Sequence, residues 1–238
     1  MNRPSIFQFL SMMLLANIRV LKGREMKKIS RLLVAFAVLC WAGLASADPM
    51  SDAIVELQHD WAKGYYNTPA KQQDSYFEAL QAKAHQVTEK FPGRPEPLIW
   101  EGIITSTHAK YQGIFSAGGT AKAARDLLLA AEKIDANALD GSALTSLGSL
   151  YYKVPRFGSF GDHDKAREYL ERALKINPNG IDPNFFYGEL MLEKGDYKKA
   201  SEYLKKALAA PPRPGREDAD EGRRGEIQQA LKKAEQHM

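Results

Sequence analysis

The chain has 238 residues, of which 44% are hydrophobic and 26% are charged, enough for one globular domain with a continuous core. Its formal net charge of +4 comes from the first 47 residues, which hold seven basic residues and one acidic residue. Residues 48–238 contain 26 basic and 28 acidic residues, and this balance argues against a nucleic-acid-binding protein.

The first 47 residues have the pattern of an N-terminal extension followed by a cleaved signal peptide. A basic segment (residues 26–31, MKKISR) precedes an apolar run of 13 residues (32–44), which is too short to span a bilayer comfortably. The sequence ASA at 45–47 then supplies a small-x-small cleavage pattern. We expect translation to start at Met26 and cleavage to follow Ala47; a longer, two-part signal is the alternative. The mature protein is then expected to be periplasmic, with no stable membrane span.

The only cysteine, Cys40, lies in this apolar run. The three residues before it (AVL) make a poor lipoprotein box, because the residue that precedes a lipid-modified cysteine is normally small. We therefore expect no lipid anchor, and neither disulfide nor thiol chemistry in the mature protein.

Apolar periodicity predicts two helical hairpins in the first half of residues 48–238. The first hairpin has two helical stripes and ends at Phe91-Pro92; its stripes are Ile54, Leu57, Trp61, Tyr65 and then Tyr76, Leu80, Ala84, Val87. The second hairpin begins near Pro97 and is a weak copy of the repeats that follow. Its marker residues are Trp100, Gly102, Ala124, Leu128 and Ala131.

Two stretches in the second half align without a gap at an offset of 34 residues and are identical at ten of eighteen positions: 161–178 (GDHDKAREYLERALKINP) and 195–212 (GDYKKASEYLKKALAAPP). This period, with small, large, small and proline positions in order, is typical of the tetratricopeptide (TPR) repeat. The shared positions are Ala166, Leu170, Ala173 and Pro178, which recur as Ala200, Leu204, Ala207 and Pro212. We predict the clearest repeats at 143–178 and 181–212.

The spacing has a physical reason. Two antiparallel helices pack closely only where small residues lie between their backbones, so we place the alanines at the closest approach. Leucines fill the groove, and proline ends the second helix. A last helix over 216–236, acidic at its start and basic at its end, is expected to cap the solenoid. The prediction is one all-α domain over 48–238, a TPR-like solenoid of about four helical hairpins plus a C-terminal capping helix.

The length of the turn inside a hairpin indicates where a binding surface lies. From the first-helix glycine to the second-helix alanine there are 12 residues in the last repeat, 18 in the one before and 22 in the weak repeat. We expect both longer repeats to enlarge the same turn, so that the insertions line one edge of the solenoid. The candidate binding residues there are Arg156, Phe157, Phe160, Tyr111 and Phe115. The alternative is that Phe157 and Phe160 plug the gap between hairpins, and the binding surface is then expected on the concave helices, at Tyr151, Tyr152 and Tyr187.

No catalytic, metal or cofactor pattern occurs in the sequence, and we expect no enzyme activity. Glu56-x-x-His59 has the helical spacing of di-iron bundles, but such a site needs a second pair, and none exists. Asp162 is better explained as a helix cap than as a cation ligand. Arg213 and Arg216 are candidates to receive an acidic partner or a carboxylate, or else they pair with the acidic residues that follow them.

Three segments from residue 151 onward carry a narrower likeness: YYKVPRFGSFGDHDKA, LKINPNGIDPNFFYGELMLEKGDY and APPRPGREDADEGRRGEI. They resemble the TPR component of TPR-associated TRAP transporters over about the last 90 residues. The resemblance implies a periplasmic, all-helical, self-associating protein whose partner is a solute-binding protein, with a channel through the fold that passes ligand. The chain departs from that family in lacking a convincing lipid-anchored cysteine.

Two functions are therefore expected as alternatives. The first is a periplasmic interaction or scaffold protein that binds a protein partner, in a narrower version as accessory subunit of a solute uptake system. The second is direct binding of a small carboxylate or hydrophobic solute in a pocket beneath the inserted turns.

Overall fold

The computed structural model describes residues 48–238, which form one compact unit. The predicted signal peptide lies outside these residues. The described residues form nine α-helices and no strand, as the sequence predicted. The helices are α3 (Pro49–Ala62), α4 (Ala70–Lys90), α5 (Pro95–Tyr111), α6 (Ile114–Ile134), α7 (Ala138–Lys153), α8 (His163–Ile176), α9 (Ile181–Glu193), α10 (Tyr197–Leu208) and α11 (Glu217–Glu235), and a π-helical turn, η2 (Lys63–Asn67), follows α3.

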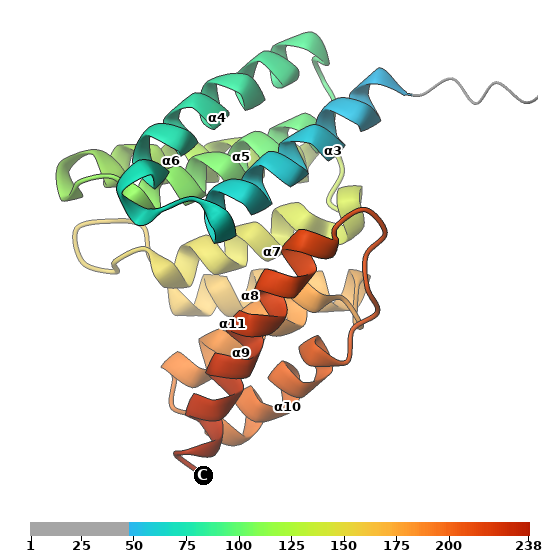
Figure 1. The fold of residues 1–238 in the computed structure, drawn as a ribbon. Helices are drawn as coiled ribbons and strands as arrows, with labels where there is room; N and C mark the ends of the chain where they lie inside the picture. The colour runs from blue at the N-terminus through green and yellow to red at the C-terminus, as the bar shows by residue number, and fades with distance from the viewer. Residues whose placement is uncertain (1–47) are drawn as a thin grey trace, which may run out of the picture. The chain divides into compact units, whose positions relative to one another are not determined.

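The helices pair as four antiparallel hairpins, α3 with α4, α5 with α6, α7 with α8 and α9 with α10, stacked in chain order (Figure 1). Helix α11 follows the last hairpin. The predicted TPR-like solenoid of four hairpins with a C-terminal helix is thus confirmed. None of the helices within 48–238 is both long and apolar enough to cross a membrane.

In three consecutive hairpins the paired helices approach so closely that only glycine fits. A Cβ added to Gly148 would lie 2.5 Å from Cγ of Leu170 and 3.1 Å from the carbonyl oxygen of Ala166. The distance to leucine Cγ is 2.7 Å and 2.8 Å in the equivalent pairs Gly102–Leu128 and Gly188–Leu204. The sequence prediction assigned this close approach to the alanines. The structure gives it to first-helix glycines, while the repeat alanines are fully buried beside them.

Aspartates begin the second helices of the two strong repeats. The side chain of Asp162 accepts hydrogen bonds from the backbone N–H groups of Asp164 and Lys165, and Asp196 accepts one from that of Lys199. Each bond satisfies an N–H that has no partner within its own helix. Asp162 is therefore a helix cap, as its alignment with Asp196 indicated.

The two predicted insertions have different structures. Residues 154–162 form an irregular loop between α7 and α8, as expected. The weak repeat has no enlarged turn, because α5 and α6 are joined by Gln112 and Gly113 alone. Its extra residues lengthen the helices instead, and α6 reaches 21 residues. For that repeat, the prediction of a long turn was wrong.

Helix α11 does more than cap the last hairpin. It packs on α10 and α9 and also contacts α3 and η2 at the other end of the solenoid, crossing in front of α9 and α7 in Figure 1. Ala219, near its start, is 2% exposed and belongs to the N-terminal core with Trp61 and Trp100. The last helix therefore joins the first hairpin to the last.

Candidate functional site

A cavity of about 1060 Å³ lies between the first helices of the hairpins and α11. Its lining comes from α3, η2, α5, the first part of α6, α7 and α9, from the 154–159 segment of the loop before α8, from the turn at 177–180, and from residues 211–223 around the start of α11. Repeat solenoids present a concave surface of this kind for binding. Here α11 covers part of that surface and makes it a partly enclosed site.

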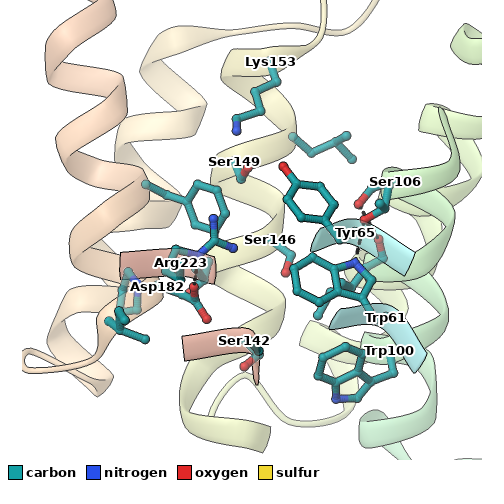
Figure 2. A pocket seen from close by; sticks show the side chains of 18 of the residues that line it. Trp61, Tyr65, Trp100, Ser106, Ser142, Ser146, Ser149, Lys153, Asp182 and Arg223 are labelled. Atoms are coloured by element: carbon teal, nitrogen blue, oxygen red, sulfur yellow. Dashed lines mark hydrogen bonds and ion pairs between the residues drawn. The ribbon is translucent and has the colours of Figure 1, made fainter. Parts of the chain in front are cut away.

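One wall of the cavity is aromatic (Figure 2). Trp61 stacks on Tyr65 with ring centroids 5.0 Å apart and meets Trp100 edge-on at 6.5 Å. The Trp61 indole is held in place because its Nε1 donates a hydrogen bond of 2.9 Å to Oγ1 of Thr107. The ammonium group of Lys110 lies 4.4 Å from the Tyr65 ring centroid and closes this end of the wall.

The π-helical turn η2 directs two adjacent tyrosines to different neighbours. Tyr65 stacks on Trp61 in the cavity wall, whereas Gly222 of α11 packs directly against the ring of Tyr66. The side-chain amide of Gln73 donates to the backbone carbonyls of Gly64 and Tyr65 and supports the turn.

The facing wall is a row of hydroxyls on α7. Ser142, Ser146, Ser149 and Lys153 are spaced by four, three and four residues, which places them on one face of the helix. Figure 2 shows the three serines along α7 with Lys153 beyond them. Among the described residues, neither Ser146 nor Ser149 makes a side-chain hydrogen bond within the protein, so both hydroxyls are available to a ligand.

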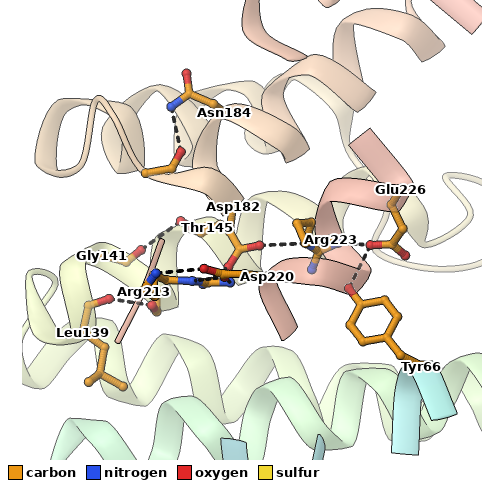
Figure 3. Close-up of polar contacts among 12 residues, drawn as sticks. Tyr66, Leu139, Gly141, Thr145, Asp182, Asn184, Arg213, Asp220, Arg223 and Glu226 are labelled. Atoms are coloured by element: carbon orange, nitrogen blue, oxygen red, sulfur yellow. Dashed lines mark hydrogen bonds and ion pairs between the residues drawn. The ribbon is translucent and has the colours of Figure 1, made fainter. Parts of the chain in front are cut away.

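A partly buried charge cluster ties α9 to the start of α11 (Figure 3). Asp182 receives Arg213 at 2.6 Å and Arg223 at 2.8 Å, and Asp220 receives Arg213 at 2.6 Å. Burial alone favours the neutral acid at Asp182, but Arg213 and Arg223 outweigh it and hold the pKa of this carboxyl well below its usual range. The cluster fixes the segment that forms one side of the cavity.

Glu226 fastens α11 to the first hairpin. It accepts hydrogen bonds from the hydroxyls of Tyr65 at 3.2 Å and Tyr66 at 3.1 Å, and it pairs with Arg223 on its own helix. Burial, with the nearby Glu226 carboxylate, raises the pKa of the Tyr65 phenol, so this hydroxyl stays protonated as a donor. The bonds hold α11 across the concave surface.

Residues 159–216 match the tetratricopeptide repeat family model. Similar solved structures include a thermophilic TPR protein of Thermus thermophilus, at 17% identity over 66% of this chain and 91% of that one, with a TM-score of 0.40. MamA is 19% identical over 72% of this chain and 95% of its own, with a TM-score of 0.41. The pilF structure of Pseudomonas aeruginosa is 15% identical over 79% and 90%, with a TM-score of 0.33. No curated protein sequence matched the chain.

The TPR architecture is consistent with a scaffold for protein–protein interaction. Three of the predicted binding residues, Phe115, Arg156 and Phe157, lie at the surface of the protein. Phe115 at the start of α6 is 100% exposed and Phe157 in the α7–α8 loop is 99% exposed, next to the exposed Arg156. Phe157 also lines the cavity.

The other predicted aromatics are packing residues. Phe160 is half-buried, with its ring 5.6 Å from that of Tyr151 and the guanidinium of Arg125 at 4.7 Å over its face. Tyr111 stacks on Phe77 at 5.4 Å. The fallback set Tyr151, Tyr152 and Tyr187 is buried between helices and does not line the cavity. The plug alternative therefore describes Phe160 but not the exposed Phe157, and Tyr111 is likewise a packing residue. The alternative binding surface at Tyr151, Tyr152 and Tyr187 was wrong, because these tyrosines are core residues.

The basic residues after the last repeat have separate partners. Arg213 belongs to the Asp182 cluster. Arg224 donates to the backbone carbonyls of Leu208 and Ala210. Arg216 lines the cavity. Of the di-iron candidates, Glu56 pairs with Lys83, and His59 lies 3.5 Å from Asp218 of α11.

Most of the residues that line the cavity were not predicted from the sequence as site residues. Trp61 and Tyr65 were predicted only as members of a helical stripe and Trp100 only as a repeat marker, and Asp182 was not predicted as a site residue. One signal was available: a polar row at 142, 146, 149 and 153 on the first helix of a repeat is unexpected for a buried helix and indicates a concave surface. Nothing in the sequence indicated that α11 would cross to α3.

Proposed function

We propose that this TPR protein binds a small amphipathic solute in the cavity between its concave surface and α11, and that it is not an enzyme. The observation that supports this most directly is the position of α11. Because that helix crosses the concave surface and is fastened by Glu226 to the first hairpin, the site is a partly enclosed cavity of about 1060 Å³ rather than an open groove. Ligand sites are typically apolar concavities of about 300–1,000 Å³ with a few placed polar groups.

The lining favours a ligand with one apolar and one polar side. Trp61, Tyr65 and Trp100 offer flat apolar contact, and the α7 serines offer hydrogen bonds on the facing wall. A purely apolar solute would leave the hydroxyls without partners, and a fully polar one would leave the aromatic wall unused. The cavity thus fits an amphipathic solute with an aromatic or aliphatic body.

An uncharged fluorescent probe, 1-aminoanthracene, tests the cavity directly. We expect saturable binding to the purified protein. Ser146→Phe places a ring in the cavity opposite the aromatic wall and should weaken binding about tenfold or more. The matched control is Ser75→Phe, at an exposed position on α4, which should bind as the wild type does. Equal binding by both variants, or none by the wild type, would contradict the proposal.

A second function, partner docking, is supported by the exposed aromatics at the edge of the solenoid. Phe115 and Phe157 are both fully exposed, and the segments that carry them both line the cavity. Exposed aromatics beside an arginine such as Arg156 are frequent anchors of protein interfaces. Phe157→Ser should leave the melting temperature unchanged and reduce capture of a periplasmic partner or self-association by about 1 kcal/mol or more. Loss of stability with capture intact would make this loop structural.

Together these two surfaces suit an accessory subunit of a TRAP-type solute uptake system in the periplasm. The support is the sequence resemblance of the last 90 residues together with a cavity whose edge carries the exposed loop. Co-purification with a periplasmic solute-binding protein, lost in Phe157→Ser and retained in Arg167→Gln on the exposed face of α8, is the expected result. If both variants still co-purify with the solute-binding protein, the loop that carries Phe157 is not its docking surface and the proposal loses this support.

A further inference from the structure

Arg216 stands out among the three arginines of the cavity because it makes no ion pair within the described residues. Its guanidinium carbon lies 5.1 Å from the ring centroid of Trp100, at the end of the aromatic wall opposite Lys110. The side chain comes from the turn directly before α11 and is only partly exposed. A stacked guanidinium therefore forms part of the cavity surface.

The other two arginines and Lys153 are paired with carboxylates, and Lys110, at the opposite end of the aromatic wall, donates a hydrogen bond to the hydroxyl of Tyr65. Arg213 pairs with Asp182 and Asp220, Arg223 pairs with Asp182 and Glu226, and Lys153 at the far end of α7 lies 3.0 Å from Glu189. Within residues 48–238, by contrast, Arg216 makes no ion pair at all, and its Nε is buried without a hydrogen-bond acceptor. The carboxylates of the cluster are used by its neighbours.

The surroundings of Arg216 are also short of acceptors. The indole Nε1 of Trp100, beneath the guanidinium, is another buried donor without a partner among the described residues. Burial lowers the pKa of the Arg216 guanidinium and the adjacent positive charge of Arg213 lowers it further, and the carboxylates of Asp182, Asp220 and Asp218 offset this only in part. Buried donors without partners are uncommon in folded proteins and call for an explanation such as a bound ion or ligand.

We propose that Arg216 binds the carboxylate of the cavity ligand, while Trp100 and Trp61 contact the ligand's apolar body. This inference rests on the proposed function and specifies its ligand class, an aryl or alkyl carboxylate. The planar guanidinium offers two parallel N–H donors that match the two oxygens of a carboxylate. Stacking on Trp100 holds that plane in a fixed orientation beside the aromatic wall.

The chemistry also excludes simpler roles for Arg216. A helix-capping or salt-bridge role needs an acceptor on the protein, and none lies within ion-pair distance in the described part of the chain. A purely structural stack on Trp100 would stabilise the fold equally well whether the ligand is charged or neutral. Discrimination between a carboxylate and its neutral amide is therefore the property that distinguishes a binding role from a packing role.

The test compares 4-phenylbutyrate with 4-phenylbutyramide, which has the same body without the charge. Both are measured by displacement of 1-aminoanthracene from the purified protein. The wild type should prefer the carboxylate by about 10- to 100-fold, the range expected for hydrogen bonds to a charged group. Arg216→Gln should bring this preference close to one, Arg216→Lys should keep part of it, and Arg167→Gln on the exposed face of α8 should keep all of it.

The outcomes separate this inference from the proposed function. If the probe and the amide bind but the wild type shows no preference for the carboxylate, the assignment to Arg216 is overturned and the cavity function stands. The same holds if Arg216→Gln, with an unchanged melting curve, retains the preference. If the probe itself does not bind, both proposals fail. The wild-type comparison requires no variant, so a poorly folded Arg216→Gln would still leave the inference open to refutation.

Discussion

Replacement of Gly148 by alanine tests the close packing of the two helices, α7 and α8, within one repeat. The added Cβ would lie 2.5 Å from Cγ of Leu170 and 3.1 Å from the carbonyl oxygen of Ala166, whereas ordinary contacts are 3.4–4 Å. Cγ is the branch point of the leucine, not its flexible end, and the carbonyl belongs to the backbone of α8. The two helices must therefore separate, and overpacking of this kind costs about 1–3 kcal/mol.

The helix propensity of alanine acts in the opposite direction. Gly→Ala inside a helix is worth about 1 kcal/mol where nothing obstructs the new methyl group. Gly119 in α6 provides that reference, because no atom lies within 4 Å of its Cβ position. We expect Gly119→Ala to stabilise the protein by about 0.5–1 kcal/mol. Relative to that reference, Gly148→Ala should lose the full overpacking cost of about 1–3 kcal/mol.

A double-mutant cycle with Leu170→Ala isolates the contact. Leu170→Ala alone should destabilise strongly, by about 2–5 kcal/mol. It also removes the leucine atoms closest to the new methyl group, so that only the carbonyl oxygen of Ala166, at 3.1 Å, remains near it. Gly148→Ala should then have little cost in the Leu170→Ala background, which gives a coupling energy of about 1–3 kcal/mol. The measurement is denaturant unfolding followed by circular dichroism at 222 nm. If Gly148→Ala stabilises as much as Gly119→Ala, the close approach is wrong.

Three further predictions concern the core, the charge cluster and the N-terminus. Ala173→Leu and Ala207→Leu, at fully buried positions, should each cost about 1–3 kcal/mol; an unchanged melting temperature in both would contradict the repeat phase. Asp182→Asn should cost about 1–3 kcal/mol by weakening bonds from two arginines. Because the folded-state pKa of Asp182 is depressed, its contribution is complete above the unfolded value of about 4 and is lost as pH falls further, so the wild type but not Asp182→Asn should lose this increment on acidification. Intact-mass analysis of the exported protein should show a start at Asp48; a lipid adduct on Cys40 would refute it.

The fold was predictable from the sequence because the same pattern of helix-packing residues occurs in successive repeats. The 34-residue offset, the alanine and leucine positions and the apolar stripes are local signals that recur, and each helix they indicated is present. The glycines were used as repeat markers only, because the space beside Gly148 depends on how Leu170 is oriented in the partner helix. Helix length was also indeterminate for the weak repeat, where a longer α6 and a longer turn produce the same residue spacing.

The site was predictable only in part because its residues come together through α11. Exposed loop residues such as Arg156 and Phe157 were found from the insertion, which is a property of the chain itself. The meeting of Trp100 with Arg216 joins residues far apart in the sequence, through a helix whose course is set by the tertiary contacts of Glu226 and Ala219. No periodicity in a single sequence carries that information.

The course of α11 also changes how the solenoid holds together. In an open array each repeat contacts only its neighbours, and the ends are energetically independent. Here α11 packs on α9 and α10 and reaches α3 and η2, so the first and last hairpins share one element. Loosening of α11 would expose the apolar wall at Trp61 and release the charge cluster at Asp182 at the same time. A ligand bound between that wall and the start of α11 would contact both parts. Because it would bind only the form in which α11 is docked on the first hairpin, it should stabilise that form against loosening of α11.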